Sequence, residues 1–380
     1  MRLLICSTEY YPHGSGIANV AYNIVEELKN LGVDCTICSP SGPDIVLGSE
    51  KIISKFGRLG LIYYWFQVSN YFRNMDEHYD VVWLHQPFIL FNNPFKVSVS
   101  TIHITTQGHF KASKRLNYTF LFRTYLFISS ILEKHSLKKL KSTTFFVTDS
   151  PKVSQELVNI IGTNEKSIYI PNGVDTKRFK PLTDKKSIRN KCNLPNDSLV
   201  FIAIGRLAYQ KNLFLMLDLF NYIQQKLKNC YLLIAGRGPL YQKLHDYIHE
   251  KNILNVKLLG FVSDNDLPSI YACGDFYVMT SEYEGLPLTL LEAMSSGLPC
   301  IVSNIPNLKL VEDANSGLFV DFSDKEKAFE GIFNYIQNKD LKHGDNARKY
   351  AVNNLDWEII AKKYLVEFKL CNDLYENSSY

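Results

Sequence analysis

Short apolar segments alternate with helix-period segments along the whole chain, and this alternation most restricts the possible fold. Short apolar runs suit buried strands of parallel sheets, and the segments between them suit connecting helices. The first half has expected strands at Leu3–Ser7, Asp34–Cys38, Val81–His85, Ser100–Ile104, Thr144–Thr148 and Ser167–Ile170. The second half has them at Leu199–Ile204, Tyr231–Ala235, Val256–Leu259, Phe276–Met279, Pro299–Val302 and Gly317–Val320. The sequence therefore predicts an α/β protein with two doubly wound domains in tandem.

The chain length and one turn-rich segment indicate where the domains meet. A chain of 380 residues is too long for one ordinary domain and suits two. The segment Ile170–Pro181 contains an Asn-Gly turn and two prolines, which end the first sheet. We expect an N-terminal domain over 1–170, a C-terminal domain over 171–355, and a final helix within 356–380 that packs back on the first domain. Ligands of such sheets bind at the carboxyl ends of strands, so the cleft between two facing domains is the expected site.

The composition is that of a globular protein and excludes several classes. Hydrophobic residues make up 46% and charged residues 21%, which is not a disordered composition. No apolar stretch reaches the roughly 18 residues that a membrane span needs, and the N-terminus lacks the layout of a signal peptide. We therefore expect a cytoplasmic protein whose eight scattered cysteines are reduced. Cys35-Thr-Ile-Cys38 has the spacing of a redox pair or half a zinc site, but it lies in an expected strand. A nucleic-acid partner is not expected.

A turn and helix start near residue 285 form the most specific motif. Residues 281–300 read Ser-Glu-Tyr-Glu-Gly-Leu-Pro-Leu-Thr-Leu-Leu-Glu-Ala-Met-Ser-Ser-Gly-Leu-Pro-Cys. Pro287 suits the first helical position, where its missing N–H would have no partner, and the start of such a helix favours an anion. Because Glu284 precedes the helix and Glu292 lies within it, both can reach one cleft and hold the hydroxyls of a nucleotide sugar. An ordinary helix start with one solvated and one ion-paired Glu is the alternative.

Two cations follow the first expected strand of the second domain. The segment reads Gly205-Arg-Leu-Ala-Tyr-Gln-Lys-Asn212. Arg206 can form two parallel hydrogen bonds to phosphate oxygens, and Lys211 adds a mobile point charge. Together they would stabilise a diphosphate leaving group as it gains charge. A solvated Arg and Lys in a loop is the alternative.

A glycine-rich loop also follows the first strand of the chain. It contains Gly14 and Gly16, but Asn19 stands where a dinucleotide fingerprint has its third glycine. A nicotinamide or flavin site is therefore not expected. The loop still lets the backbone approach a phosphate closely.

Two further strand ends of the second domain are candidates for contact with a nucleotide base. Gly236 belongs to the turn Ala235-Gly-Arg-Gly-Pro239, and Phe261 and Val262 follow the next strand. The nearby Asp264-Asn-Asp266 has the form of a metal–diphosphate motif, but its place before a helix favours helix capping.

Two histidines end strands of the first domain. His103 falls at the end of the fourth strand and could hydrogen-bond a sugar hydroxyl or help to position a proton. His85 ends the third strand and is the second candidate. A structural histidine inside the fold is the alternative for each.

Taken together, these motifs resemble the family-four retaining glycosyltransferases of GT-B architecture. The resemblance covers nearly the whole chain. In order, its elements are the Gly14/Gly16 loop, His103, Pro171-Asn-Gly-Val-Asp175, Gly205-Arg206 with Lys211, Gly236-Arg-Gly238-Pro239, Glu284 with Glu292, and a closing helix that begins near Trp357. Asn304-Ile-Pro-Asn307 departs from the family, which commonly has a Gly-rich stretch there. The resemblance implies two Rossmann-like domains that face each other across a deep cleft, with the C-terminal helix crossing back.

The resemblance also implies an activity. A hexosyl- or other glycosyltransferase would move a sugar from a nucleotide donor, foremost a UDP- or GDP-sugar, to a saccharide or lipid-linked acceptor with retained anomeric configuration. It implies no cofactor and no divalent metal. His103 and Glu284 would be the catalytic residues. The donor would be held by Gly16, Arg206 and Lys211 at the diphosphate, by Glu284 with Gly285, Leu286, Pro287 and Leu288 at the sugar, and by Glu292 at the ribose.

Two other functions use a similar cleft. A sugar-nucleotide epimerase would turn over without an acceptor, and a non-catalytic nucleotide-sugar binding protein would bind without turnover. Product formation with and without cell lipids separates all three.

A basic and apolar region of the first domain is the candidate contact for a membrane. Lys111–Lys141 contains eight basic residues and one acid, Glu133, around a mostly apolar helical stretch at Leu116–Leu132. The segment Gly57–Phe66 is also apolar and aromatic. These features predict docking on an anionic membrane surface, where a lipid-linked acceptor would be met. Two core-packing helices with solvated lysines are the alternative.

Overall fold

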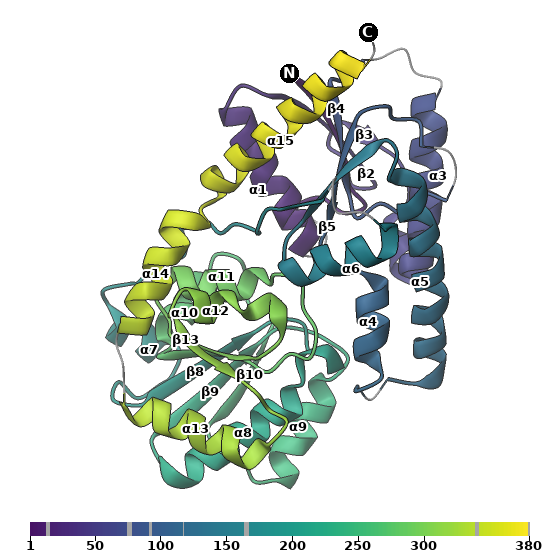
Figure 1. Cartoon of the computed structure of the whole chain (residues 1–380). Coiled ribbons are helices and arrows are strands. Elements are labelled where there is room, and N and C mark those ends of the chain that lie inside the picture. The colour runs from purple at the N-terminus through teal and green to yellow at the C-terminus, as the bar shows by residue number, and fades with distance from the viewer. Residues whose placement is uncertain are drawn as a thin grey trace. The chain divides into compact units, whose positions relative to one another are not determined.

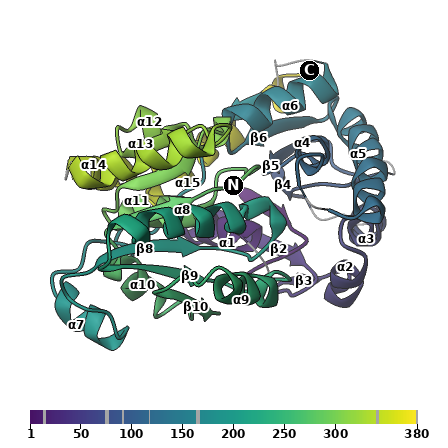
Figure 2. The same cartoon turned by 90° about the horizontal axis from the view of Figure 1, so that it is seen from below.

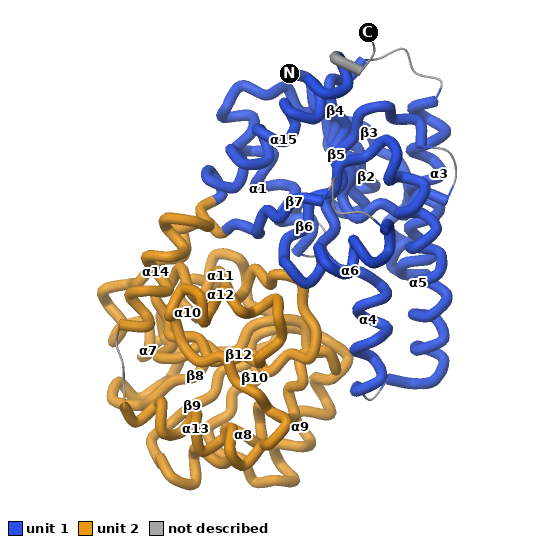
Figure 3. The backbone as a smooth tube through the Cα atoms, in the orientation of Figure 1, with its two compact units in different colours: residues 1–173, 357–380 blue, residues 174–356 orange. Residues whose placement is uncertain are grey.

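The computed structural model describes residues 1–12, 16–73, 78–90, 93–116, 118–162, 167–338 and 342–378. The chain divides into two compact units, which Figure 3 shows in different colours. Unit 1 comprises Met1–Gly173 and Trp357–Tyr380, and unit 2 comprises Val174–Asp356. The predicted boundaries at 170/171 and 355/356 lie a few residues from these divisions. Gly14 of the predicted phosphate loop lies outside the described residues. That the two domains face each other across a cleft remains a prediction.

In unit 1, the described strands form one parallel sheet in the order β3-β2-β1-β4-β5-β6-β7. Its strands are β1 (Arg2–Cys6), β2 (Asp34–Ser39), β3 (Ile45–Val46), β4 (Val81–His85), β5 (Ser98–Ile102), β6 (Thr144–Thr148) and β7 (Ser167–Tyr169). The six strands predicted for the first half are present, with β5 beginning two residues earlier than expected. The short strand β3 was not predicted. It pairs with the end of β2 at the sheet edge.

Helices cover both faces of the unit 1 sheet (Figure 1). They are α1 (Gly16–Asn30), α2 (Glu50–Phe56), α3 (Arg58–Arg73), α4 (Thr106–Ser113), α5 (Phe120–Leu140), α6 (Pro151–Ile161) and α15 (Trp357–Ser378). Because side chains alternate along a strand, Val82 and Leu84 of β4 join the core cluster that includes Trp65 of α3. Trp83 between them packs against Tyr364 of α15, with ring centroids 5.0 Å apart. The predicted closing helix thus belongs to unit 1.

In unit 2, the described strands form a second parallel sheet in the order β10-β9-β8-β11-β12-β13. They are β8 (Leu199–Ile204), β9 (Cys230–Ala235), β10 (Val256–Gly260), β11 (Phe276–Met279), β12 (Cys300–Ser303) and β13 (Gly317–Val320). The helices are α7 (Lys185–Lys191), α8 (Leu213–Lys226), α9 (Tyr241–Glu250), α10 (Leu267–Cys273), α11 (Leu288–Ser295), α12 (Leu310–Asp313), α13 (Lys325–Asn338) and α14 (Lys342–Asn354), with short 3-10 helices η1 (Tyr209–Lys211) and η2 (Pro306–Leu308). All six predicted strands are present.

The alternation of side chains along the strands builds two cores in unit 2. Val200 and Ile202 of β8 belong to a cluster with α10, α11 and α14. Phe201 and Ala203, which alternate with them, belong to a cluster with α8, α9 and α13. Each sheet is therefore the middle of three layers, as predicted from the continuous apolar strands.

The strand orders define where a ligand can bind. In each sheet, successive strands are first added on one side of the first strand and then on its other side. This change lies between β1 and β4 in unit 1 and between β8 and β11 in unit 2. Loops at the carboxyl ends of such strands diverge and leave room for a ligand. The loops that follow β8 and β11 carry Arg206, Lys211 and Glu284. None of the helices in the described ranges has the length and apolar character needed to cross a membrane.

Candidate functional site

The loops that follow β8 and β11 are fastened to each other. The Thr280 hydroxyl lies 3.1 Å from the carbonyl oxygens of both Lys211 and Asn212. The Asn212 side-chain amide donates to Glu282 Oε1 at 2.9 Å, and the Glu282 backbone N–H donates to the Gln210 carbonyl at 2.9 Å. The position of Lys211 relative to the Glu284 turn is therefore fixed by hydrogen bonds from both loops.

Glycines let the strand ends approach closely. A Cβ atom at Gly236 would lie 1.8 Å from the Gly205 carbonyl oxygen, where no side chain fits. Gly236 also has φ +142° and donates its N–H to the Gly260 carbonyl at 2.7 Å. The structure thus gives Gly236 a packing role, and its predicted contact with a base remains a prediction.

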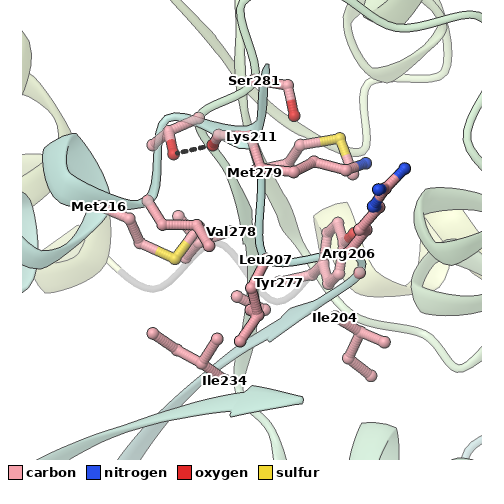
Figure 4. Close-up of a pocket in the computed structure, with 14 residues that line it drawn as sticks. Ile204, Arg206, Leu207, Lys211, Met216, Ile234, Tyr277, Val278, Met279 and Ser281 are labelled. Atoms are coloured by element: carbon pink, nitrogen blue, oxygen red, sulfur yellow. Dashed lines mark hydrogen bonds between the residues drawn. The ribbon is translucent and has the colours of Figure 1, made fainter. Parts of the chain in front are cut away.

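A small cavity of about 20 Å³, with room for about one water molecule, lies at these strand ends, and Arg206, Lys211, Met279 and Ser281 are among its lining residues (Figure 4). In the view of Figure 4, the Arg206 guanidinium and the Lys211 ammonium point to the same side. Arg206 is exposed, whereas Lys211 is partly covered. Two cations at a topological switch point suit an anion such as a diphosphate, and this role for Arg206 and Lys211 remains a prediction.

Lys211 and Glu284, for which the sequence predicted separate contacts, are paired with each other. Lys211 Nζ lies 2.7 Å from Glu284 Oε1, and the side chains are 17% and 8% exposed. Gln210 Nε2 lies 3.5 Å from the other carboxylate oxygen of Glu284. The contact with Lys211 is an ion pair rather than a well-aligned hydrogen bond. An arriving anion would compete with Glu284 for the lysine.

The helix after Glu284 begins one residue later than predicted. Pro287 is the residue that precedes helix α11, with φ −73° and ψ 128°, and Leu288 is the first helical residue. The extended ψ of Pro287 keeps it out of the helix, so the prediction that it occupies the first helical position is wrong. Gly285 is partly exposed, whereas Leu286 is buried in the core. Only the backbone of Leu286 is therefore placed to meet a ligand, together with the first N–H groups of α11, which have no intrahelical acceptor.

Glu292 lies one to two turns into α11 and is partly buried. The Tyr271 hydroxyl donates to Glu292 Oε2 at 2.7 Å. Burial raises the pKa of Glu292 to about 7, although the Tyr271 hydrogen bond and the Arg178 charge oppose the rise. Its carboxyl group can therefore accept or donate a hydrogen bond near neutral pH.

Two polar residues at this site were not predicted. Asn307 in η2 is 5% exposed and donates its side-chain amide to the Glu284 carbonyl. This contact fixes the amide orientation, because a carbonyl needs a donor, and it leaves Asn307 Oδ1 without a partner among the residues that the structure describes. The same holds within the described ranges for the hydroxyl of Ser281, a residue that lines the cavity and is 1% exposed. In the sequence, the signal for Asn307 was that Asn304–Asn307 departs from the Gly-rich stretch common in the family.

The predicted base contacts lie on the adjacent strand ends. Phe261 is 61% exposed, and the Arg237 guanidinium lies 4.4 Å from the centre of its ring. Val262 is partly buried and packs against the core. Arg237 also accepts a hydrogen bond at its carbonyl from Leu207, which follows Arg206. An exposed aromatic ring backed by a guanidinium therefore stands beside the cation loop.

His103 of unit 1 is enclosed rather than open. It follows β5 and is 6% exposed. Its Nδ1 lies 3.3 Å from Asp149 Oδ2, and its Nε2 lies 3.5 Å from His85 Nδ1. His85 is fully buried, and burial together with the neighbouring His103 holds the pKa of His85 well below its usual range. Both histidines thus belong to one buried polar chain. A direct contact of the His103 ring with a sugar remains a prediction, and it would require this chain of contacts to open.

The remaining predicted groups are placed as follows. Gly16 is the exposed first residue of α1. Asp266 precedes α10, but its carboxylate accepts from the Ser263 hydroxyl at 2.6 Å and does not cap the helix. Across the described ranges, no three His, Cys, Asp or Glu side chains are grouped as a metal site. That the reaction needs no metal remains a prediction.

Sequence comparison divides the chain as the structure does. The family described as "Glycosyltransferase Family 4" matches residues 14–178, and the family described as "Glycosyl transferases group 1" matches residues 184–353. An Escherichia coli protein named UDP-Gal:alpha-D-GlcNAc-diphosphoundecaprenol alpha-1,3-galactosyltransferase is 35% identical over 197 residues, which is 50% of this chain and 51% of that protein. Over this match the chain spans about half the length of its relative. The alpha-monoglucosyldiacylglycerol synthase of Acholeplasma laidlawii is 24% identical over 99% of this chain and 96% of its own.

Comparison with solved structures shows the fold. WaaG, a glycosyltransferase involved in lipopolysaccharide biosynthesis, has a TM-score of 0.75 at 17% identity and covers 95% of this chain and 98% of its own. Sucrose-phosphate synthase from Thermosynechococcus elongatus has a TM-score of 0.75 at 19% identity, with 99% of both chains covered. The two parallel sheets, the two matched families and these likenesses agree, and the chain belongs to the family-four glycosyltransferases with GT-B architecture.

Proposed function

We propose that this protein is a retaining glycosyltransferase that moves a sugar from a nucleotide-sugar donor to a saccharide or lipid-linked acceptor. The observation that carries the proposal is the convergence of Arg206, Lys211 and Glu284 at the topological switch point of unit 2. Two cations there suit a diphosphate, and a carboxylate beside them suits sugar hydroxyls. An epimerase or a simple binding protein would not need an acceptor, and membership of the family favours transfer over both.

In this proposal, the donor itself opens the ion pair between Lys211 and Glu284 when it binds. A diphosphate attracts Lys211 and so releases the Glu284 carboxylate. The released carboxylate then accepts hydrogen bonds from the sugar, together with the backbone from Gly285 to Leu288. A free sugar without a diphosphate does not separate the pair and binds weakly.

The other predicted groups complete the donor site. We propose that the Gly16 backbone contacts the diphosphate, Glu292 the ribose, and His103 the transferred sugar. Phe261, with Val262 and Gly236, borders the base.

The reaction that we propose keeps the anomeric configuration. The acceptor hydroxyl attacks from the face of the leaving group, and an oxygen of the departing diphosphate takes the acceptor proton. Arg206 and Lys211 stabilise the charge that develops on the diphosphate without a divalent metal. Glu284 and Glu292 bind hydroxyls at separate ends of the donor and do not act as the paired carboxylates of a glycoside hydrolase.

The relatives indicate which substrates to test first. One is named for UDP-Gal and a diphosphoundecaprenol acceptor, another for monoglucosyldiacylglycerol. A UDP- or GDP-sugar donor and a lipid-linked acceptor in cell-envelope glycan synthesis are therefore our proposal. Thermal-shift measurements with UDP-, GDP- and ADP-sugars select the donor, since a ligand that binds the folded state stabilises it. Nucleoside diphosphate release that requires a lipid extract supports transfer. A changed sugar on the nucleotide without acceptor identifies an epimerase, and stabilisation without any product identifies a binding protein.

We also propose that unit 1 docks on an anionic membrane from the cytoplasmic side. Helices α4 and α5 lie side by side (Figures 1 and 2). One exposed stripe of α5 is apolar in its first turns and basic in its last turns. The apolar part comprises Phe120, Leu121, Phe127, Ile128 and Ile131, and the basic part comprises Lys134, Lys138 and Lys139. The apolar part enters the interface and the lysines meet anionic headgroups.

The docking is tested with liposomes that contain anionic lipid. Phe120 and Leu121 are 82% and 80% exposed, so their replacement by Ser leaves the core intact. Each contributes about 1.5–3 kcal/mol when buried in lipid, whereas each lysine contributes about 1 kcal/mol. The double variant therefore loses binding by at least tenfold. Leu254→Ser in unit 2, at a side chain 68% exposed, is the matched control and binds normally. Binding that is equal for the double variant and the wild type contradicts docking through this stripe.

A further inference from the structure

Two cysteine thiols meet in unit 2, at the contact between α7 and α10. Cys192 directly follows α7, and Cys273 is the last residue of α10. Their sulfur atoms are 3.1 Å apart, which is about 1 Å longer than a covalent disulfide bond. Both are free thiols in the structure. The two sulfurs are therefore already in contact across 81 residues of sequence.

A buried guanidinium holds the two segments in this arrangement. Arg189 of α7 is 5% exposed and donates from Nε to the Cys273 carbonyl at 3.1 Å. It also pairs at 2.6 Å with Asp275, which lies two residues after the end of α10. On the other side, Lys257 Nζ donates to the Cys192 carbonyl at 3.0 Å. Hydrogen bonds from Arg189 and Lys257 to the backbone carbonyls of the two cysteines thus hold the thiols in place. Little movement is needed to join their sulfur atoms.

The two thiols differ in access. Cys192 is partly exposed, whereas Cys273 is fully buried. Burial and the neighbouring Cys192 raise the pKa of the Cys273 thiol, and the charges of Arg189 and Lys185 oppose this rise. An oxidant in solution therefore reaches Cys192 first, and Cys273 is placed to attack the product.

We propose that Cys192 and Cys273 form a modification site that a small disulfide, such as oxidised glutathione, converts reversibly to an intramolecular disulfide. The Cys192 thiolate attacks one sulfur of the oxidant, so that a mixed disulfide forms and one glutathione leaves as a thiolate. Cys273 then gives up its proton and attacks the Cys192 sulfur, and the second glutathione leaves. Two protein thiols are oxidised, and one small disulfide is reduced to two thiols.

The disulfide would tie α7 to a helix that supports the candidate site. Tyr271, which lies two residues before Cys273 in α10, donates a hydrogen bond from its hydroxyl to Glu292. A disulfide that closes a long loop without strain lowers the entropy of the unfolded chain. Oxidation would therefore raise the melting temperature of unit 2, by roughly 5–10 °C for a unit of this size. This inference does not depend on the proposed transfer reaction.

The test treats the full chain with excess oxidised glutathione, blocks the remaining thiols with N-ethylmaleimide and maps the peptides by mass spectrometry. The expected product is a peptide containing Cys192 joined to one containing Cys273, which dithiothreitol separates. Cys273→Ser should instead accumulate glutathione on Cys192, and Cys192→Ser should form no such link. Cys230→Ser, at another buried thiol, should behave like the wild type.

Two results would overturn the proposal. One is a wild-type protein that keeps glutathione on Cys192, as Cys273→Ser does. The other is a pair that remains reduced while other thiols react. The partly exposed Cys192→Ser variant keeps the test decisive even if Cys273→Ser folds poorly. A cross-linked protein that melts no higher than the reduced protein would show that the link strains unit 2.

Discussion

Removal of the Lys211 charge should destabilise unit 2, because Glu284 would lose its counter-ion in a covered position. Lys211→Met keeps most of the side-chain length and removes the ammonium. Glu284 is 8% exposed and lies 2.7 Å from Lys211 Nζ. The variant therefore leaves a carboxylate that is neither paired nor well hydrated.

The magnitude follows from the geometry of the pair. Two unit charges 2.7 Å apart attract by roughly 6 kcal/mol at an effective dielectric constant of about 20. Dehydration of both groups opposes this attraction, and removal of one partner from a buried pair costs about 3–5 kcal/mol. Because Lys211 is 17% exposed and water can enter from the cavity, we expect the lower end, about 3 kcal/mol. Glu284→Gln leaves a flexible ammonium that can reach water, and should cost about 1 kcal/mol.

The double variant Lys211→Met/Glu284→Gln should be less destabilised than the two single losses together, by about 2 kcal/mol. Urea unfolding can be followed by hydrogen exchange of peptides from β11 and α11. The three tryptophans, Trp65, Trp83 and Trp357, all lie in unit 1. Tryptophan fluorescence therefore reports on unit 1, whose unfolding midpoint should not change.

Lys185→Met is the matched control. Lys185 Nζ also lies 2.7 Å from a carboxylate, that of Asp275, but these side chains are 39% and 27% exposed. Its loss should cost less than about 1 kcal/mol, as for other exposed pairs. Equal costs for Lys211→Met and Lys185→Met, or strictly additive losses in the double variant, would refute the argument that the Lys211–Glu284 pair is desolvated.

Three further predictions concern the donor site. Asn307→Ala removes the donor to the Glu284 carbonyl and should raise KM for the donor about tenfold; unchanged kinetics would show that the amide does not orient Glu284. Glu292 has a folded pKa of about 7 against an ordinary value of 4.5, so the folded state binds the extra proton between these pH values. Unit 2 of the wild type should therefore lose stability as pH rises from 4.5 to 7, whereas Glu292→Gln, which has no charge to gain, should lack this loss; parallel curves would contradict the buried carboxyl. Arg237→Ala should weaken nucleotide binding about tenfold through loss of stacking at Phe261 while leaving kcat unchanged, and equal affinity by calorimetry would place the base elsewhere.

Much of the fold could be predicted because the strands are buried on both faces. Runs such as Phe276–Met279 are apolar at every position, which is typical of a strand buried on both faces. Turn residues mark their ends. The strand β3 is only Ile45–Val46, too short to give a periodic signal. The hydroxyl of Ser98, the first residue of β5, lies 2.8 Å from that of Thr144 on the neighbouring strand. Only the fold supplies that partner, so the sequence makes Ser98 look like a loop residue.

The candidate site was predicted as a set of residues but not as a set of contacts. Arg206, Lys211 and Glu284 could be located because strand ends and spacing indicate one edge of a sheet. That Lys211 pairs with Glu284 depends on the hydrogen bonds between their loops, which no local pattern encodes. His103 could be placed after a strand, but Asp149 and His85, which enclose it, lie on other segments of the chain.

The same reasoning explains the unpredicted polar groups. Asn307 became visible only as a departure from a glycine-rich pattern, and its contact with the Glu284 carbonyl needed the structure. Ser281 is one of many serines, and only its buried place in the lining of the cavity distinguishes it. Long-range contacts and unsatisfied atoms are properties of the folded chain rather than of local sequence.

The most direct test of the central claim compares Glu284→Gln with the wild type, in both turnover and nucleotide binding. Turnover is the release of nucleoside diphosphate from the donor selected by thermal shift, in the presence of a lipid extract. Binding is the calorimetric affinity for the nucleoside diphosphate alone. We predict that the variant loses turnover by roughly 100-fold or more, while its affinity for the diphosphate is equal or higher, because Lys211 is no longer held by Glu284. Unaltered turnover, or turnover and affinity lost together, would contradict a carboxylate that holds the sugar.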